Sequence, residues 1–236
     1  MSERHPPCTA RWLGRVDYEE AWALQRELAV RRATGEIEDT LLLLEHPSVY
    51  TTGRRTCADR LLVPAEALGA PLLEVDRGGD VTFHGPGQLI AYPIIGLGAR
   101  PRGVQAYVRG LEETIIRTLT GYGIEAERAQ GLTGVWIGRD KVAAIGVRVS
   151  RPGGAAGGWV SSHGLALNVS VDLAWFERIV PCGIADHGVT SMERVLGLSL
   201  PLMQVAERLA CQFAAVFGRD VTPLDASPVP PQTSLI

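Results

Sequence analysis

The sequence predicts an α+β domain in which helices pack on a mixed or antiparallel sheet. Three stretches have helical spacing, several short apolar runs have the length of strands, and the middle strands are joined by turns rather than by crossover helices. The 236 residues suffice for one large domain with a sizeable core. We expect this domain over residues 1–218 and a loosely ordered tail, rich in Pro, Ser and Thr, over residues 219–236.

The first helix is predicted from Asp17 to about Ala33. Asp17 and Glu20 form a capping-box pattern at its start, and Gly35 is suited to end it. The run from Thr40 to Leu44 is continuously apolar apart from its first residue, which indicates a buried strand.

The rest of the chain contains further segments with clear periodicity. Helices are expected where apolar side chains recur at helical spacing, at 104–119 and from about Pro201 to Phe217. Strands are expected at 72–75, 89–95, 134–137, 141–149 and 163–171. The third and fourth of these strands are separated by a short turn, so they form a predicted hairpin.

Composition excludes several classes of function. The formal net charge of −3 gives no reason to expect binding to nucleic acid or to a membrane surface, although a local basic patch could still recognise an acidic protein. No apolar run reaches the roughly 18 residues that span a bilayer, and the N-terminus lacks the apolar core of a secretory signal. The four cysteines have neither paired nor zinc-ligand spacing, which indicates free thiols in the cytoplasm.

The segment Arg77–Tyr92, RGGDVTFHGPGQLIAY, contains four glycines in sixteen positions. Glycine is tolerated where the backbone turns sharply or approaches another group closely. Next to the side chains of Arg77 and His84, such backbone can hold a ligand with its N–H groups. The alternative is a plain turn between two strands.

Cys182 lies between Pro181 and Gly183, which places its thiol on a bend that can present it to a pocket. The alternative is a buried cysteine that packs as a small apolar residue. Cys211 falls in the apolar stripe of the last helix, so we expect it in the core.

Lys141 is the candidate cation for that thiol. It begins an otherwise apolar strand, a position that is usually a solvated rim. A lysine near a thiol lowers the thiol pKa and so raises the thiolate fraction. His46, His84 and His163 each precede a proline or glycine, and we expect at least one of them in a pocket, with His46 and His163 as candidate supporting residues.

Three common catalytic patterns are missing from the sequence. It contains no GxSxG nucleophile elbow, no GxxxxGKS/T phosphate loop and no GxGxxG dinucleotide fingerprint. A serine hydrolase, a P-loop enzyme and a Rossmann oxidoreductase therefore lack support.

Taken together, these residues resemble the octanoyltransferase family of lipoate biosynthesis. The glycine-rich segment is similar to the family signature, in which Arg-Gly-Gly is followed by Thr-aromatic-His-Gly-x-Gly-Gln. The blocks Lys141–Gly146, His163–Asn168 and Pro181–Gly183 follow in the family's order. The resemblance extends from about residue 40 to residue 192, with no departure at a position expected to do chemistry.

The resemblance implies the α+β fold of the lipoate and biotin protein ligase catalytic domain, with a mixed sheet. It also implies a ping-pong acyl transfer, in which Cys182 becomes an octanoyl thioester while Lys141 favours its thiolate and helps to move protons. The implied substrate-binding residues are Arg77, Gly78, Gly79, Asp80, Val81, Thr82, Phe83, His84, Ala144, Ile145, Gly146, Gly164, Leu165 and Ala166.

The implied donor is octanoyl-acyl carrier protein, in the first step of endogenous lipoate biosynthesis. The implied acceptors are the lipoyl domains of 2-oxoacid dehydrogenase complexes and the glycine cleavage H protein. We expect no cofactor, no metal, no nucleic acid and no membrane partner.

Two alternatives stay open. An ATP-dependent lipoate–protein ligase has a related loop but is expected to follow its loop histidine with an acidic residue, whereas Gly85 follows His84 here. A non-catalytic module that binds an acyl group or a carrier protein would leave Cys182 and Lys141 incidental.

Overall fold

A computed structural model describes residues 5–54, 60–98, 103–152, 154, 157–180 and 187–225. The α-helices are Tyr18–Ala33 (α1), Val104–Thr120 (α2), Met192–Leu196 (α3) and Leu202–Phe217 (α4). Short 3-10 helices are Ala65–Ala67 (η2) and Leu173–Arg178 (η4). The strands are Pro7–Arg15 (β1), Asp39–Glu45 (β2), Val49–Thr52 (β3), Leu72–Glu74 (β4), Thr82–His84 (β5), Gln88–Ile94 (β6), Val135–Ile137 (β7), Asp140–Ser150 (β8), Val160–Asn168 (β9) and Asp220–Val221 (β10).

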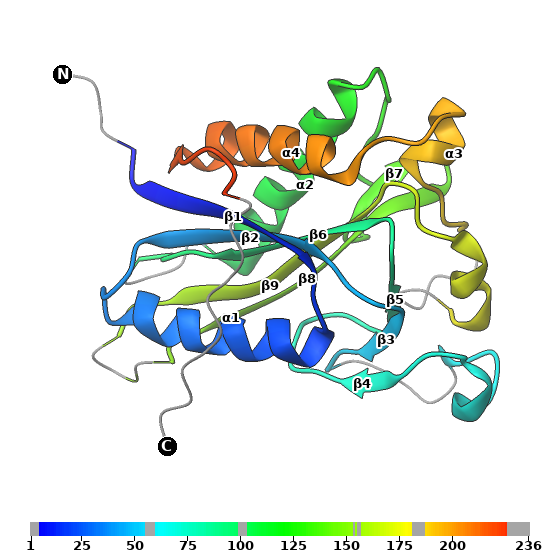
Figure 1. Cartoon of the computed structure of the whole chain (residues 1–236), viewed down its shortest axis with the longest axis horizontal. Coiled ribbons are helices and arrows are strands. Elements are labelled where there is room, and N and C mark those ends of the chain that lie inside the picture. Colours follow the sequence, from blue (N-terminus) through cyan, green and yellow to red (C-terminus); the bar gives the residue numbers. More distant parts are fainter. Residues whose placement is uncertain are drawn as a thin grey trace.

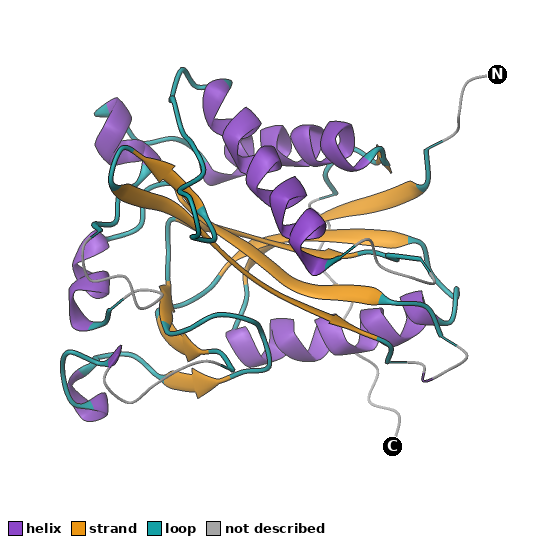
Figure 2. Ribbon diagram, turned by 180° about the vertical axis from the view of Figure 1, so that it is seen from behind, coloured by secondary structure: helices purple, strands orange, loops and turns teal. Residues whose placement is uncertain are grey.

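A twisted seven-stranded sheet forms the middle layer, in the order β10-β1-β2-β6-β9-β8-β7. The pairs β10–β1 and β1–β2 are parallel and the others are antiparallel. Helix α1 covers one face of the sheet, while α2 and α4 pack together on the other (Figure 1). Figure 2 shows the same three layers from behind. The predicted α+β class with a mixed sheet is confirmed.

The two-sided cover explains why the run in β2 does not alternate. Leu41 and Leu43 pack with residues of α2 and α4 in the larger core cluster. Leu42 and Leu44 point the other way and pack with residues of α1. Because both faces of the strand are buried, a half-polar pattern would leave polar side chains without water.

A small second sheet, in the order β4-β3-β5, lies beside one end of the large one (Figure 1). Its strands carry the chain into and out of the glycine-rich segment, because β4 precedes that segment and β5 lies inside it. The aromatic ring of Phe83 in β5 stacks on Trp175 of η4, with ring centroids 5.0 Å apart. This packing fixes the 77–84 segment against the rest of the molecule.

The predicted helices and strands are confirmed, with small shifts of their bounds. Helix α1 has Asp17 as its N-cap, although the Asp17 side chain accepts a hydrogen bond from the Glu19 amide rather than from Glu20. None of β1, β3, β5, β10, η2, η4 and α3 was predicted from the sequence.

The expectation of a loosely ordered tail from residue 219 is wrong for its first part. Strand β10 pairs with β1, and Asp225 pairs with Arg11, so residues 220–225 extend the sheet at its edge. The remaining tail, 226–236, lies outside the described residues. None of the helices described is long and apolar enough to cross a membrane.

The burial of β2 inside the sheet leads to a prediction about the stability of the fold. Leu43→Ala removes a fully buried side chain between two helices, and we expect it to lower the free energy of unfolding by about 2–5 kcal/mol. The matched control is Leu198→Ala, because Leu198 is 53% exposed and should change that free energy by less than about 0.5 kcal/mol. Urea unfolding followed by circular dichroism measures both, and equal effects would contradict the assigned core.

Candidate active site

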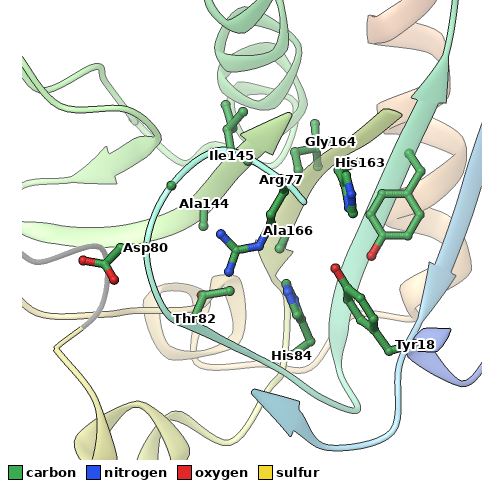
Figure 3. A pocket seen from close by; sticks show the side chains of 14 residues that line it. Tyr18, Arg77, Asp80, Thr82, His84, Ala144, Ile145, His163, Gly164 and Ala166 are labelled. Carbon is green, nitrogen blue, oxygen red and sulfur yellow. The ribbon is translucent and has the colours of Figure 1, made fainter. Parts of the chain in front are cut away.

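A pocket opens where the middle of β8 and β9 faces the 77–84 segment (Figure 3). It contains about 440 Å³ of space not filled by protein atoms, part of which is open to solvent. The lining comes from α1, the 77–84 segment, β6, β8 and β9. The lining residues are Tyr18, Arg77, Gly79, Asp80, Thr82, His84, Tyr92, Ala144, Ile145, Gly146, His163, Gly164, Leu165 and Ala166.

All predicted substrate-binding positions line this pocket except Gly78, Val81 and Phe83. Val81 and Phe83 are fully buried in a separate apolar cluster with Tyr50. The alternation of β5 explains the division, because Thr82 and His84 point into the pocket while Phe83 points away. Gly78 instead donates its backbone N–H to the carbonyl of Val147, 3.0 Å away.

Two tyrosines that were not predicted from the sequence also line the pocket. Tyr18 is the first residue of α1, and its ring stacks on His84 with centroids 5.7 Å apart. Tyr92 in β6 is the last residue of the glycine-rich segment and was given no role from the sequence. The aromatic type at the start of a helix gives no sequence signal for a pocket, since the same residue also fits a core position.

Arg77 is buried beneath the pocket, with only 7% of its surface exposed. Its Nη2 donates to the backbone carbonyl and to the hydroxyl of Thr51, both 2.8 Å away, and its Nη1 donates to the carbonyl of Gly78 at 3.1 Å. The close approach of Arg77 and the Gly78 carbonyl to β8 requires a glycine at that point of the strand. A Cβ at Gly146 would lie 2.8 Å from the Gly78 carbonyl oxygen and 3.0 Å from Arg77 Cδ.

A buried hydrogen-bonded chain begins at His84. The amide nitrogen of Gln88 donates to the Phe83 carbonyl and to Asn168 Oδ1, so Gln88 Oε1 must be the acceptor of His84 Nδ1–H at 2.8 Å. Asn168 then donates to the carbonyl of Thr190 at 3.0 Å. These contacts connect the glycine-rich segment with the chain that follows residue 186.

The tautomer of His84 follows from the same contacts. Since Nδ1 carries the proton, Nε2 accepts from the hydroxyl of Thr51 at 3.3 Å. Burial, followed by the charges of His46 and Arg77, holds the pKa of His84 well below its ordinary value, so the ring is neutral.

His46 lies beside the pocket rather than in its lining. Its Nδ1 donates to the Val16 carbonyl at 2.7 Å, and its Nε2 accepts from the hydroxyl of Tyr92 at 2.9 Å. Burial lowers the pKa of His46 to about 4. The ring therefore supports Tyr92 as a neutral group.

His163 lines the pocket in an unusual backbone conformation, with φ of 54°. Non-glycine residues adopt such angles at a cost and do so where the surroundings hold them. Its backbone N–H donates to Gln25 Oε1 at 2.7 Å, and its Nε2 donates to Asp76 at 2.8 Å. Burial, followed by the charges of Arg77 and Arg148, lowers the pKa of His163 to about 3. The prediction of a pocket histidine is confirmed at His84 and His163.

Lys141 is buried, with 5% of its surface exposed, so the interpretation of a solvated rim residue is wrong. It lines a small cavity together with Thr82, Gln88, Ala144, Asn168, Phe176 and Val189. Thr82 and Ala144 also line the main pocket. Lys141 therefore lies directly beside the pocket that the glycine-rich segment lines.

Cys182 lies outside the described residues, but the chain on both sides of residues 181–186 is described. After this stretch, the backbone of Lys141 exchanges hydrogen bonds with Gly188 and Thr190. Before it, the N–H of Val180 donates to the carbonyl of Arg60 at 2.8 Å.

Val180 and His187 line the same cavity, which also includes Phe176 and Val189. Those last two residues line the cavity beside Lys141 as well. The two ends of the stretch that carries Cys182 therefore line a cavity that shares two residues with the cavity beside Lys141, which in turn shares two residues with the main pocket.

The described cysteines offer no thiol to this pocket. Cys8 is fully buried in β1, and burial, followed by the charge of Asp39, raises the pKa of its thiol to about 12. Cys211 is exposed on α4, so its expected place in the core is wrong. The helix turns its other face, with Leu209 and Phe213, toward the sheet. Cys57, like Cys182, lies outside the described residues.

The chain belongs to a known class of catalytic domains. The family model described as the lipoyl protein ligase A/B catalytic domain matches residues 17–214. A solved chain from the lipoylation system of Thermoplasma acidophilum, a bi-partite lipoate protein ligase described with its E2 lipoyl domain, has a TM-score of 0.67. It is 14% identical, and the match covers 97% of this chain and 89% of that one, which confirms the expected fold.

Closer relatives are named octanoyltransferases. The one from Rubrobacter xylanophilus is 50% identical over 223 residues, which cover 92% of this chain and 97% of the relative. The one from Chloroflexus aggregans is 51% identical over 219 residues, which cover 91% and 96%. The chain belongs to the octanoyltransferase family.

The buried neutral histidines predict how stability changes with pH. In the unfolded chain a histidine binds a proton below about pH 6.5, while folded His46 stays neutral down to about pH 4. Between these values the unfolded state binds more protons, so the free energy of unfolding decreases as the pH falls. We expect His46→Gln to flatten this dependence by about 1.4 kcal/mol per pH unit. Urea unfolding at about pH 6 and about pH 5 gives the slope, and an unchanged slope would show that His46 is charged in the fold.

Proposed function

We propose that this octanoyltransferase moves an octanoyl group from octanoyl-acyl carrier protein to a lysine of lipoyl domains, with Cys182 as the nucleophile. The observation that carries the proposal is a row of three neighbouring cavities that share lining residues. Thr82 and Ala144 line both the main pocket and the cavity beside Lys141, and Phe176 and Val189 line both that cavity and the one at the two ends of the stretch that holds Cys182.

The first half-reaction exchanges one thioester for another. The Cys182 thiolate attacks the carbonyl carbon of the donor thioester, the bond to the carrier sulfur breaks, and the carrier leaves as a thiol after it takes up a proton. Lys141 provides the nearby positive charge that raises the thiolate fraction of Cys182. Because the bond broken and the bond formed are of the same kind, this step is close to balanced.

The second half-reaction makes the product amide. The neutral ε-amine of the acceptor lysine attacks the octanoyl thioester, the amide C–N bond forms, and the cysteine sulfur leaves. The amine nitrogen loses one proton and the thiolate can regain one through Lys141. Amide formation from a thioester is downhill, so ATP is not needed.

The pocket suits an eight-carbon chain. Its wall on β8 and β9 is formed by the small apolar side chains of the cross-strand partners Ala144 and Ala166 and by the facing pair Gly146 and Gly164. Each buried CH₂ contributes about 0.8 kcal/mol to binding. The backbone of the glycine-rich segment can offer N–H donors to the oxyanion of each step.

The acceptor and the cellular location follow from the same chemistry. Lipoyl domains of 2-oxoacid dehydrogenase complexes and the glycine cleavage H protein present the lysine, and the related Thermoplasma acidophilum ligase is described with its E2 lipoyl domain. Free thiols and a carrier-protein donor support a cytoplasmic reaction.

The proposal predicts a covalent intermediate. Incubation of the enzyme with octanoyl-acyl carrier protein should add one octanoyl group, which peptide mass spectrometry should locate on Cys182. Cys182→Ser should lose the thioester adduct and lower transfer to a lipoyl domain by at least about a thousandfold. The matched control is Cys211→Ser, because Cys211 is exposed on α4 and away from the pocket.

The same assay separates the two alternatives. Transfer from octanoyl-acyl carrier protein without ATP excludes a ligase mechanism, whereas strict dependence on ATP would overturn the proposal. An adduct on another residue, or transfer that persists at full rate in Cys182→Ser, would overturn the assignment of the nucleophile.

A further inference from the structure

Trp136 is the cross-strand partner of Lys141. Strands β7 and β8 form an antiparallel hairpin in which Trp136 pairs with Lys141, after a shift of register between Val135 and Trp136. The Nζ of Lys141 lies over the indole, 4.7 Å from the ring centroid. The ring is almost fully buried, with 1% of its surface exposed. The irregular register therefore places a buried aromatic face against the ammonium group.

The contact with the Trp136 ring matters because the Lys141 ammonium is buried. Among the described residues, Lys141 Nζ has no hydrogen-bond partner, although the atom is buried. The other residues lining its cavity, Thr82, Gln88, Ala144, Asn168, Phe176 and Val189, carry no charge. Burial of an ammonium without compensation is costly, and an aromatic face can compensate part of that cost through its quadrupole.

The path of the Lys141 side chain is also fixed by β7. Gly134 has φ of 127°, and a Cβ there would lie 3.3 Å from Lys141 Cε and 2.7 Å from the Ala143 carbonyl oxygen. The aliphatic part of Lys141 therefore passes over Gly134 and delivers Nζ to the indole. A larger residue at position 134 would push the lysine out of this path.

The edge of the same indole contacts the other side of the site. His187, the first described residue after 181–186, meets Trp136 in an edge-to-face arrangement with centroids 5.0 Å apart. Asp140, next to Lys141, lies against Gly188. On the other side, the backbone of Glu127 pairs with that of Trp136. Asp140, His187 and Glu127 are therefore titratable residues that neighbouring segments bring close to this pair.

We propose that Trp136 is a positioning residue for acyl transfer, because its ring holds the Lys141 ammonium and the chain after residue 186 in one arrangement. The inference rests on the proposed function, in which Lys141 acts on Cys182. It assigns the indole a role through Lys141, without contact to the substrate.

A graded series of side chains tests the proposal. Trp136→Phe keeps an aromatic face with a weaker quadrupole, and Trp136→Leu keeps an apolar side chain without one. The matched control is Trp159→Leu, since Trp159 lines a separate cavity with Arg32, Asp39 and Arg219. Each protein is mixed with octanoyl-acyl carrier protein, and the rate of acyl-enzyme formation is measured by quenched-flow mass spectrometry.

Two further measurements separate positioning from general stability. The rate of Cys182 alkylation by iodoacetamide is followed against pH, and urea unfolding gives the stability of each variant. The double variant Trp136→Leu/Lys141→Met completes a double-mutant cycle with the two single variants.

We expect acyl-enzyme formation to fall about tenfold in Trp136→Leu and less in Trp136→Phe, with the alkylation profile moved to higher pH in the same order. In the Lys141→Met background, Trp136→Leu should cause little further loss. Wild-type rates and an unchanged pH profile in both Trp136 variants would overturn the proposal, and so would a full additional loss in the double variant.

The experiment distinguishes failure of the Trp136 inference from failure of the proposed function. If the wild-type enzyme forms no adduct on Cys182, the proposed function fails. If the wild type forms the adduct and the Trp136 variants form it at the same rate, only the role of Trp136 fails. Should Trp136→Leu fail to fold, Trp136→Phe and its pH profile decide.

Discussion

The candidate active site is organised around the burial of the Arg77 guanidinium. A buried cation needs hydrogen-bond acceptors on most of its N–H groups, and Thr51 and the Gly78 carbonyl supply several of them. To reach them, the loop must approach β8 so closely that only glycine fits at position 146. The Gly78–Val147 hydrogen bond then fixes the loop on the strand. The pocket wall is therefore held by the buried Arg77 side chain together with backbone contacts between the loop and β8.

The packing of helices on both faces of the sheet sets the positions of the remaining site residues. Strands β8 and β9 carry apolar residues toward α2 and α4, and their small residues face the loop on the other side. At one end of β8, the buried Lys141 is held by contacts from two directions. The chain of amides through Gln88 and Asn168 fixes the segment that follows residue 186, and the indole of Trp136 lies against Nζ. The two histidines that line the pocket, His84 and His163, are neutral, whereas Arg77 brings a positive charge to its lining.

The sequence predicted the parts of this site that depend on local pattern. Helix α1, the buried β2 and the hairpin before β9 follow from periodicity, and the pocket walls follow from the glycine-rich motif and the order of the later blocks. It did not predict contacts made between distant segments. Tyr18 lines the pocket only because α1 packs on the face of the sheet formed by β6 and β9, and Cys211 lies on the outer face of α4 because Leu209 and Phe213 fill the inner one. Strand β10 depends on pairing with a partner more than 200 residues earlier in the chain.

In the proposed mechanism, Cys182 and Lys141 act together at the end of the pocket that the 77–84 segment lines. A crystal structure of the octanoylated enzyme tests it most directly. We expect the acyl chain on Cys182 Sγ to extend along Ala144 and Ala166, with Lys141 Nζ within about 4 Å of the sulfur. An acyl chain outside this pocket, or a lysine ammonium more than about 6 Å from the sulfur, would contradict the account.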